Sequence, residues 1–251
     1  MEDVLRSRRH ELRVRSVARL SASMRRVVLD APELAGLPLR PAMDLGLMLT
    51  APDYSGAVRP VRRRYTIVGA DPQRGTVAVD GILHGHGPGA RWFAEVHPGA
   101  TIEAVGPRAG VEPADADWHL LVGDESALPA FAEVLGVLPP GVPAVALVEV
   151  TGADDEVAVP SRAALDLRWI HRRTEAPGGV RLLAGAVSAL SGSVPAGRGH
   201  AYLLGESRAV VALRPGVAEL GLDPDAVYVK GYWNAVPLRA GGRPVLSDGA
   251  L

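Results

Sequence analysis

A change of apolar pattern near residue 112 is the feature that most restricts how this chain can fold. Residues 12–105 hold six short apolar runs separated by Pro and Gly, and several of these runs alternate apolar and polar residues. Such alternation is typical of antiparallel strands with one buried face. From residue 118 onward, near-continuous Val/Leu runs alternate with helical patterns, as in a parallel sheet covered by helices. The sequence therefore predicts a six-stranded antiparallel barrel followed by a doubly wound parallel α/β domain.

The predicted elements follow from these runs. Barrel strands are expected at 12–20, 24–30, 43–50, 65–68, 76–84 and 100–105, with a helix at 90–96. In the second half we expect strands at 119–123, 144–150, 167–170, 201–205 and 226–233, and helices at 126–138, 180–190 and 207–220. The Pro- and Asp-rich stretch 108–117 marks the boundary, which gives a barrel domain at 1–112 and an α/β domain at 113–251.

Charge and composition exclude several classes of protein. The formal net charge of −1 argues against binding nucleic acid through bulk positive charge. The absence of cysteine excludes disulfides, thiol catalysis and cysteine-ligated clusters. No stretch approaches the length of an apolar membrane span, and the charged first residues do not resemble a secretory signal. We therefore expect a soluble, cytoplasmic protein that binds neither membrane nor nucleic acid.

The start of the predicted strand at 65–68 and the residue two positions before it bring together an arginine, a phenol and a hydroxyl. Arg63 could grip a pyrophosphate, Tyr65 could lie against a flavin ring or its ribityl chain, and Thr66 could bond to flavin N5. The alternative is an edge strand whose arginines face solvent. By itself this motif leaves both interpretations open.

A glycine-rich segment precedes the predicted helix at 90–96. Gly87, Gly89 and Ala90 would let the backbone approach an anion at the helix start, and Trp92 could stack on an adenine. The alternative is a plain turn with two solvated imidazoles, at His84 and His86. A metal site is not expected, because no third ligand of suitable type stands nearby.

Two strands of the second half end in glycine followed by acidic residues. The ends of these strands are where ligands approach a parallel sheet. The residues concerned are Gly123, Asp124, Glu125 and Ser126 at one turn, and Gly205 and Glu206 at the other. Ordinary capping of the following helices explains the same residues, and the three spaced glycines of the dinucleotide fingerprint are absent. The last strand ends Lys230-Gly231-Tyr232-Trp233, whose aromatic rings could cover a planar ligand or be buried against a helix.

Taken in order, these segments resemble the siderophore-interacting protein family, a branch of the ferredoxin–NADP reductase-like flavoproteins. The resemblance rests on residues 63–66, 80–92, 98–99, 106–107, 123–130, 169, 205–207 and 231–233. It implies an FAD-dependent oxidoreductase that reduces a ferric siderophore with electrons from NADH, NADPH or a ferredoxin. One electron converts Fe(III), which hard siderophore oxygens hold tightly, into Fe(II), which they hold weakly.

The resemblance also implies roles for individual residues. Arg63, Tyr65 and Thr66 would hold the flavin, with Tyr65 and Thr66 as the candidate catalytic residues. Ile82, Leu83 and His84 would meet the pyrimidine edge through their backbone, and residues 87–90 would meet the diphosphate. Residues 123–126 and 205–206 would border the nicotinamide dinucleotide. Lys230, Trp233 and Arg239 are candidates for the substrate side, and Arg172, Arg173 and Arg208 are candidates for a 2′-phosphate.

Three positions depart from the family pattern. Family members usually carry Arg at the positions of Val68 and Asn234, and Phe at the position of Gly81. These smaller, uncharged residues motivate a second hypothesis, in which an FAD protein serves a step of secondary metabolism with a redox-active or structural flavin. A third hypothesis is a non-enzymatic binder of a ferric chelate.

Overall fold

The computed structural model describes residues 8–52, 55–83, 87–108 and 110–235. Contacts divide the chain into two compact units. The barrel unit contains the described parts of Met1–Asp115, Leu128–Ala144 and Gly152–Leu165, and the α/β unit contains Ala116–Ala127, Val145–Thr151 and the described part of Asp166–Leu251. The predicted boundary between residues 112 and 113 stays a prediction.

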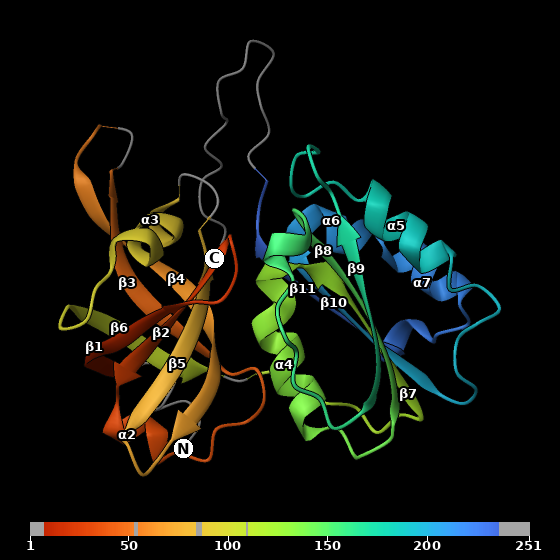
Figure 1. Ribbon diagram of the computed structural model, residues 1–251, viewed down its shortest axis with the longest axis horizontal. Coiled ribbons are helices and arrows are strands. Elements are labelled where there is room, and N and C mark those ends of the chain that lie inside the picture. The colour runs from red at the N-terminus through yellow and green to blue at the C-terminus, as the bar shows by residue number, and fades with distance from the viewer. Residues whose placement is uncertain (1–7, 53–54, 84–86, 109, 236–251) are drawn as a thin grey trace. The chain divides into compact units, whose positions relative to one another are not determined.

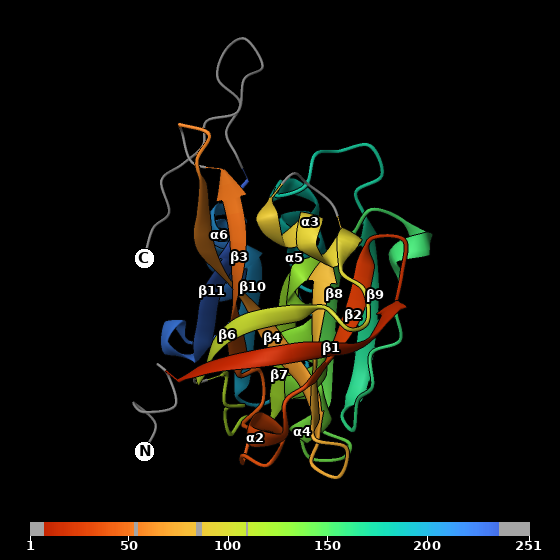
Figure 2. The ribbon, with the colours of Figure 1, turned by 90° about the vertical axis from the view of Figure 1, so that its left-hand side faces the viewer.

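Six antiparallel strands form a closed barrel in the order β1-β2-β5-β4-β3-β6 (Figures 1 and 2). They are β1 (Arg9–Arg19), β2 (Met24–Asp30), β3 (Asp44–Pro52), β4 (Val58–Asp71), β5 (Thr76–Ile82) and β6 (Thr101–Arg108). The six predicted runs are therefore confirmed as strands, although β4 begins seven residues before its apolar run. Within β4 the first seven residues are mostly exposed, so they carry no apolar period to detect.

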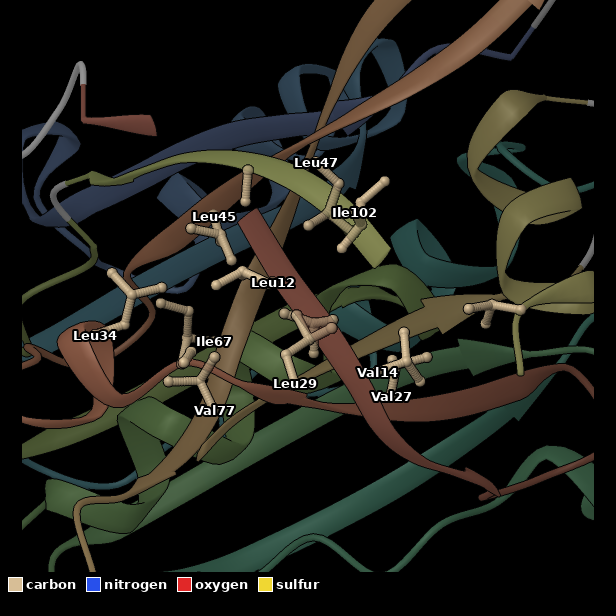
Figure 3. Packing of buried hydrophobic residues seen from close by; sticks show 14 of the residues in the cluster. Leu12, Val14, Val27, Leu29, Leu34, Leu45, Leu47, Ile67, Val77 and Ile102 are labelled. Atoms are coloured by element: carbon tan, nitrogen blue, oxygen red, sulfur yellow. The ribbon is translucent and has the colours of Figure 1, made fainter. Parts of the chain in front are cut away.

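The barrel core consists of the inward residues of these strands (Figure 3). Leu45 and Leu47 of β3, like Val27 and Leu29 of β2, are two positions apart and completely buried, as the period of a strand requires. Helix α3 (Pro88–Glu95) adds Phe93, which is also completely buried. A four-residue helix that the sequence analysis missed, α2 (Pro32–Ala35), adds further apolar side chains.

The pairing between β4 and β5 ends within the barrel wall. The cross-strand pairs recorded for these two strands begin at Asp71↔Thr76 and end at Ile67↔Val79. Beyond that point, residues 63–66 of β4 pair with β3, and residues 80–82 of β5 pair with β2. Two lengths of strand edge therefore lie beyond the end of the β4–β5 ladder. One of them carries the predicted flavin residues.

The α/β unit contains a five-stranded sheet in the order β11-β10-β7-β8-β9. Its strands are β7 (Trp118–Asp124), β8 (Pro143–Val150), β9 (Ala164–His171), β10 (Gly199–Glu206) and β11 (Val227–Trp233). Strand β10 runs parallel to both β7 and β11. The predicted fold class, an antiparallel barrel followed by a parallel α/β sheet, is confirmed.

Helices α5 (Arg181–Ser188), α6 (Ser207–Ala212) and α7 (Arg214–Glu219) pack against one apolar core with strands β7, β8 and β10 (Figure 1). Helix α4 (Leu128–Val137) follows β7 and belongs by its contacts to the barrel unit. The prediction of a single helix at 207–220 is wrong in one respect, because the segment divides into two helices at Leu213. Pro215 has no backbone N–H to continue the first helix, and it suits the first turn of the second.

Candidate functional site

The three predicted flavin residues of β4 lie beyond the end of the β4–β5 ladder. Tyr65 is largely buried, with its ring edge-on to Phe93 at a centroid distance of 4.8 Å. Burial raises the pKa of Tyr65 to about 12 against the lowering effect of the Arg63 charge, so the phenol stays protonated at neutral pH. The Thr66 side chain is buried, and its hydroxyl has no hydrogen-bond partner among the described residues.

Arg63 is exposed, and its only hydrogen bond with described residues runs to the backbone oxygen of Arg62, at 3.1 Å. Within the described part of the chain it forms no ion pair with a carboxylate. A guanidinium without a protein counter-ion is suited to an anionic ligand such as a diphosphate.

The start of α3 lies against Tyr65. A Cβ atom placed on Gly89 would stand 1.9 Å from the Tyr65 hydroxyl oxygen, so only glycine lets the helix backbone come this close. The helix begins with Pro88 after Gly87, and among the described residues no side chain caps its first amides. This is the arrangement that the glycine-rich segment predicted: amides of a helix start beside the phenol, available to an anion.

The remaining predicted residues of the barrel unit fall into three groups. Ile82 and Leu83 are half-buried at the end of β5, where the Leu83 amide donates to the Ser23 backbone oxygen at 2.6 Å. Trp92 lies half-buried on α3, edge-on to Phe93 at 4.9 Å. His84 lies outside the described residues, so its predicted contact is not described.

Phe93 is a residue of this region that the sequence analysis missed. A Cβ atom on Gly81 would stand 2.2 Å from the Phe93 ring, so the ring occupies the space beside β5 that a side chain at position 81 would need. The glycine therefore does not leave a hollow in the barrel. The signal available in the sequence was the pair itself, a glycine within a strand and one of only two phenylalanines in the chain.

These residues fit a flavin dinucleotide. The β4–β5 ladder ends beside a buried threonine and a neutral phenol, and a glycine-dependent contact brings helix amides to that phenol. The Arg63 guanidinium on the same strand, which pairs with no carboxylate among the described residues, supplies positive charge. The diphosphate, the sugar-like ribityl chain and the flavin ring of the dinucleotide therefore each have a suitable group on the barrel.

In the α/β unit, the ends of β7 and β10 approach each other very closely. A Cβ atom on Gly123 would stand 2.0 Å from the Leu204 carbonyl oxygen. Gly205 has a φ of +143°, and a Cβ there would stand 2.6 Å from an Asp124 carboxylate oxygen. Both glycines are thus required by contacts within this unit.

Asp124 is a hub of hydrogen bonds at the end of β7. Its carboxylate accepts from the Ser126 amide at 2.9 Å, the Glu206 amide at 2.9 Å and the Trp233 indole at 2.9 Å. The Ser126 hydroxyl is a further donor. Burial, followed by the charge of Glu125, raises the pKa of Asp124. The carboxylate joins the ends of β7, β10 and β11.

Glu125 forms a buried bidentate ion pair with Arg172. The two nitrogen–oxygen distances are 2.7 Å and 2.5 Å, and Glu149 lies 3.7 Å from the same guanidinium. Burial raises the pKa of Glu149 to about 7, although Arg172 lowers it. Arg172, a candidate for a 2′-phosphate, is thus already held by Glu125, whereas the other two candidates, Arg173 and Arg208, are exposed.

Glu206 caps α6, accepting from the Arg208 and Ala209 amides at 2.8 and 2.7 Å. Its other oxygen accepts from the Ala235 amide at 3.1 Å. The six predicted residues of the two turns are therefore brought together, and their carboxylates bond to the chain itself. Their contact with a dinucleotide stays a prediction.

The predicted substrate residues are only partly described. The ammonium nitrogen of Lys230 lies 5.3 Å from the centre of the Tyr232 ring, and Trp233 is held by Asp124. Arg239 lies outside the described residues. Within the described ranges, no group of three or more His, Asp or Glu side chains could hold a metal ion, and no helix is long and apolar enough to cross a membrane.

Comparison with known proteins gives matches over most of the chain. Residues 116–236 match the family described as "Siderophore-interacting protein", and residues 48–111 match the "Siderophore-interacting FAD-binding domain". The uncharacterized protein Rv2895c of Mycobacterium tuberculosis is 38% identical over 191 residues, which are 72% of this chain and 68% of that one. The ferric vibriobactin reductase ViuB of Vibrio cholerae is 29% identical, over 70% of this chain and 65% of that one.

Among solved structures, a siderophore utilization protein from T. fusca superimposes with a TM-score of 0.80. It is 29% identical, and the alignment covers 96% of each chain. The likeness extends over both the barrel strands and the parallel sheet.

Proposed function

Because the chain belongs to the siderophore-interacting protein family, we propose that it is an FAD-dependent oxidoreductase that reduces the ferric iron of a siderophore. The electrons come from NADH, NADPH or a reduced ferredoxin. The observation that carries the proposal is the meeting of β4 with the start of α3. It lies within the residues that match the FAD-binding domain, and it supports FAD as the cofactor.

FAD, when bound, supplies the chemistry of accepting two electrons and passing them on singly. Arg63 and the first amides of α3 bind the diphosphate, which their positive charge and free donors suit. Tyr65 orients the ring or ribityl chain as an uncharged phenol, because its raised pKa keeps its proton in place. The Thr66 hydroxyl would donate a hydrogen bond to the flavin ring.

In the α/β unit, residues 123–126 and 205–206 border the nicotinamide dinucleotide in this proposal. Lys230 and Trp233 lie on the substrate side, where a cation and a ring suit an anionic chelate with planar groups. Reduction weakens the hold of hard oxygen ligands on the iron, so the product is Fe(II), open to capture by other ligands. A cytoplasmic location stays a prediction.

The test begins with the purified protein. We expect a yellow protein that is bleached under anaerobic conditions by NADH, NADPH or reduced ferredoxin, and reoxidised by a ferric siderophore while a ferrous chelator traps Fe(II). A reduced flavin that ignores every ferric complex would refute the reductase and favour a flavin step on another metabolite. A colourless protein that refuses FAD yet binds the chelate would leave only the non-enzymatic binder.

A further inference from the structure

An ion pair lies on the outer face of the barrel wall, next to the point where the β4–β5 ladder ends. The last recorded pair of that ladder is Ile67 opposite Val79, and the next residues along the two strands are Thr66 and Asp80. Ile67 and Val79 both point into the core, and alternation turns Thr66 and Asp80 to the outer face. The two side chains therefore flank the point at which β4 and β5 stop pairing.

Asp80 is held by an arginine of the neighbouring strand. Arg26 of β2 is the cross-strand partner of Asp80, and its guanidinium donates from Nε to Oδ1 at 2.7 Å and from Nη2 to Oδ2 at 2.8 Å. The Asp80 side chain is only 4% exposed, whereas the Arg26 side chain is 39% exposed. The hydrogen bond to Asp80 raises the pKa of Arg26, and burial lowers it by a smaller amount, so the guanidinium stays charged. The pair is planar, bidentate and fixed.

A second carboxylate acts on the same arginine. Glu133 of α4, which belongs to the barrel unit, lies within electrostatic range of both Arg26 and Asp80. Burial raises the pKa of Glu133. The Arg26 guanidinium thus forms its ion pair with Asp80 and also feels the charge of Glu133. By contrast, the Arg15–Asp30 pair of the same barrel is well exposed, with side chains 47% and 36% accessible.

We propose that the Arg26–Asp80 pair is a positioning element that sets the charge beside the flavin ring, and with it the reduction potential. The inference rests on the proposed function, because it needs FAD at Thr66. A buried carboxylate close to the ring opposes the negative charge that reduction adds, and the guanidinium offsets part of that effect. Iron held by hard oxygen ligands is difficult to reduce, so a lowered flavin potential serves the reaction.

Removing the charge of Asp80 and removing the charge of Arg26 should shift the flavin potential in opposite directions. A merely structural role of the pair would not produce opposite shifts. In Asp80→Asn the Arg26 charge loses its closest counter-ion, so the midpoint potential of the bound flavin shifts upward. In Arg26→Met the carboxylate is left without its cation, so the potential shifts downward. The measurement is a spectroscopic redox titration of FAD-loaded protein against a reference dye. Asp30→Asn, which removes the same charge from the exposed pair, is the matched control and leaves the potential unchanged.

Glu133→Gln keeps the inference testable if a variant of the Arg26–Asp80 pair fails to fold. It removes one negative charge from a half-buried helix position, and we expect an upward shift smaller than that of Asp80→Asn. Unchanged potentials in the variants that fold, or shifts in the same direction for Asp80→Asn and Arg26→Met, would overturn the inference while leaving the flavoprotein intact. A wild-type protein that binds no FAD would instead overturn the proposed function.

Discussion

Replacing Gly89 by alanine tests the contact between α3 and β4 that the flavin site depends on. The new methyl group would stand 1.9 Å from the Tyr65 hydroxyl oxygen and 3.3 Å from the ring carbon that carries it. An ordinary contact needs about 3.5 Å, so the hydroxyl must retreat by roughly 1.5 Å. The Tyr65 ring cannot swing away freely, because Phe93 packs against it at 4.8 Å. Overpacking of this kind costs about 1–3 kcal/mol in the free energy of unfolding.

Removing the hydroxyl should relieve that cost. Tyr65→Phe deletes the nearest atom and leaves a contact of 3.3 Å, so Gly89→Ala in the Tyr65→Phe background should lose less than about 0.5 kcal/mol. Urea unfolding followed by circular dichroism gives the free energies of all four proteins of this cycle. Gly87→Ala is the control, because no atom outside the adjacent residues lies within 4 Å of its Cβ position. Equal losses from Gly89→Ala in the two backgrounds would refute the reasoning.

Three further predictions concern the α/β unit. Arg172→Met leaves Glu125 charged and buried, so we expect a loss of about 3–5 kcal/mol in urea unfolding, against almost none for exposed Arg173→Met. Burial raises the pKa of Glu149 to about 7 in the folded state, so the protonated carboxyl contributes fully to stability below the pKa of the unfolded chain, and this contribution is lost as pH rises through 7. Glu149→Gln should therefore flatten the fall in stability in a pH series of unfolding curves. Gly123→Ala forces a methyl group to 2.0 Å from a backbone oxygen of β10, so its loss should reach about 3 kcal/mol or more; a variant as stable as wild type contradicts the close approach of the strands.

The period of the apolar residues was enough to predict both architectures. Alternation located the six barrel strands, and continuous Val/Leu runs located the parallel strands, because burial on one face or on two leaves different patterns. The helix predicted at 90–96 after Gly-Pro-Gly is present, but α3 begins two residues earlier, at Pro88, because proline suits the first turn of a helix. Helix α2 was missed because four residues are too few to show a helical period.

Contacts between distant segments could not be predicted from local patterns. Asp155 lies in the acidic run 154–156, which carries no apolar pattern and so indicates a solvated turn. Its side chain is nevertheless buried, and accepts from the Ser23 amide at 2.8 Å and the Ser21 hydroxyl at 3.2 Å. Arg26 and Asp80 are 54 positions apart, and only the register of β2 and β5 reveals that they face each other. A single charged residue carries no mark of its partner, because pairing depends on registers that turn geometry and packing fix.

The glycines of the two units show why a sequence motif alone does not identify a ligand site. A glycine in a motif indicates that a side chain does not fit at that position, and only the structure shows what occupies the space. At Gly89 the occupant is the end of a tyrosine side chain, which can move, beside amides that no side chain caps. At Gly123 it is the backbone of the neighbouring strand, which cannot move, beside amides that Asp124 and Glu206 already bind. The same kind of signal therefore argues for an anion at α3 with more force than at the ends of β7 and β10.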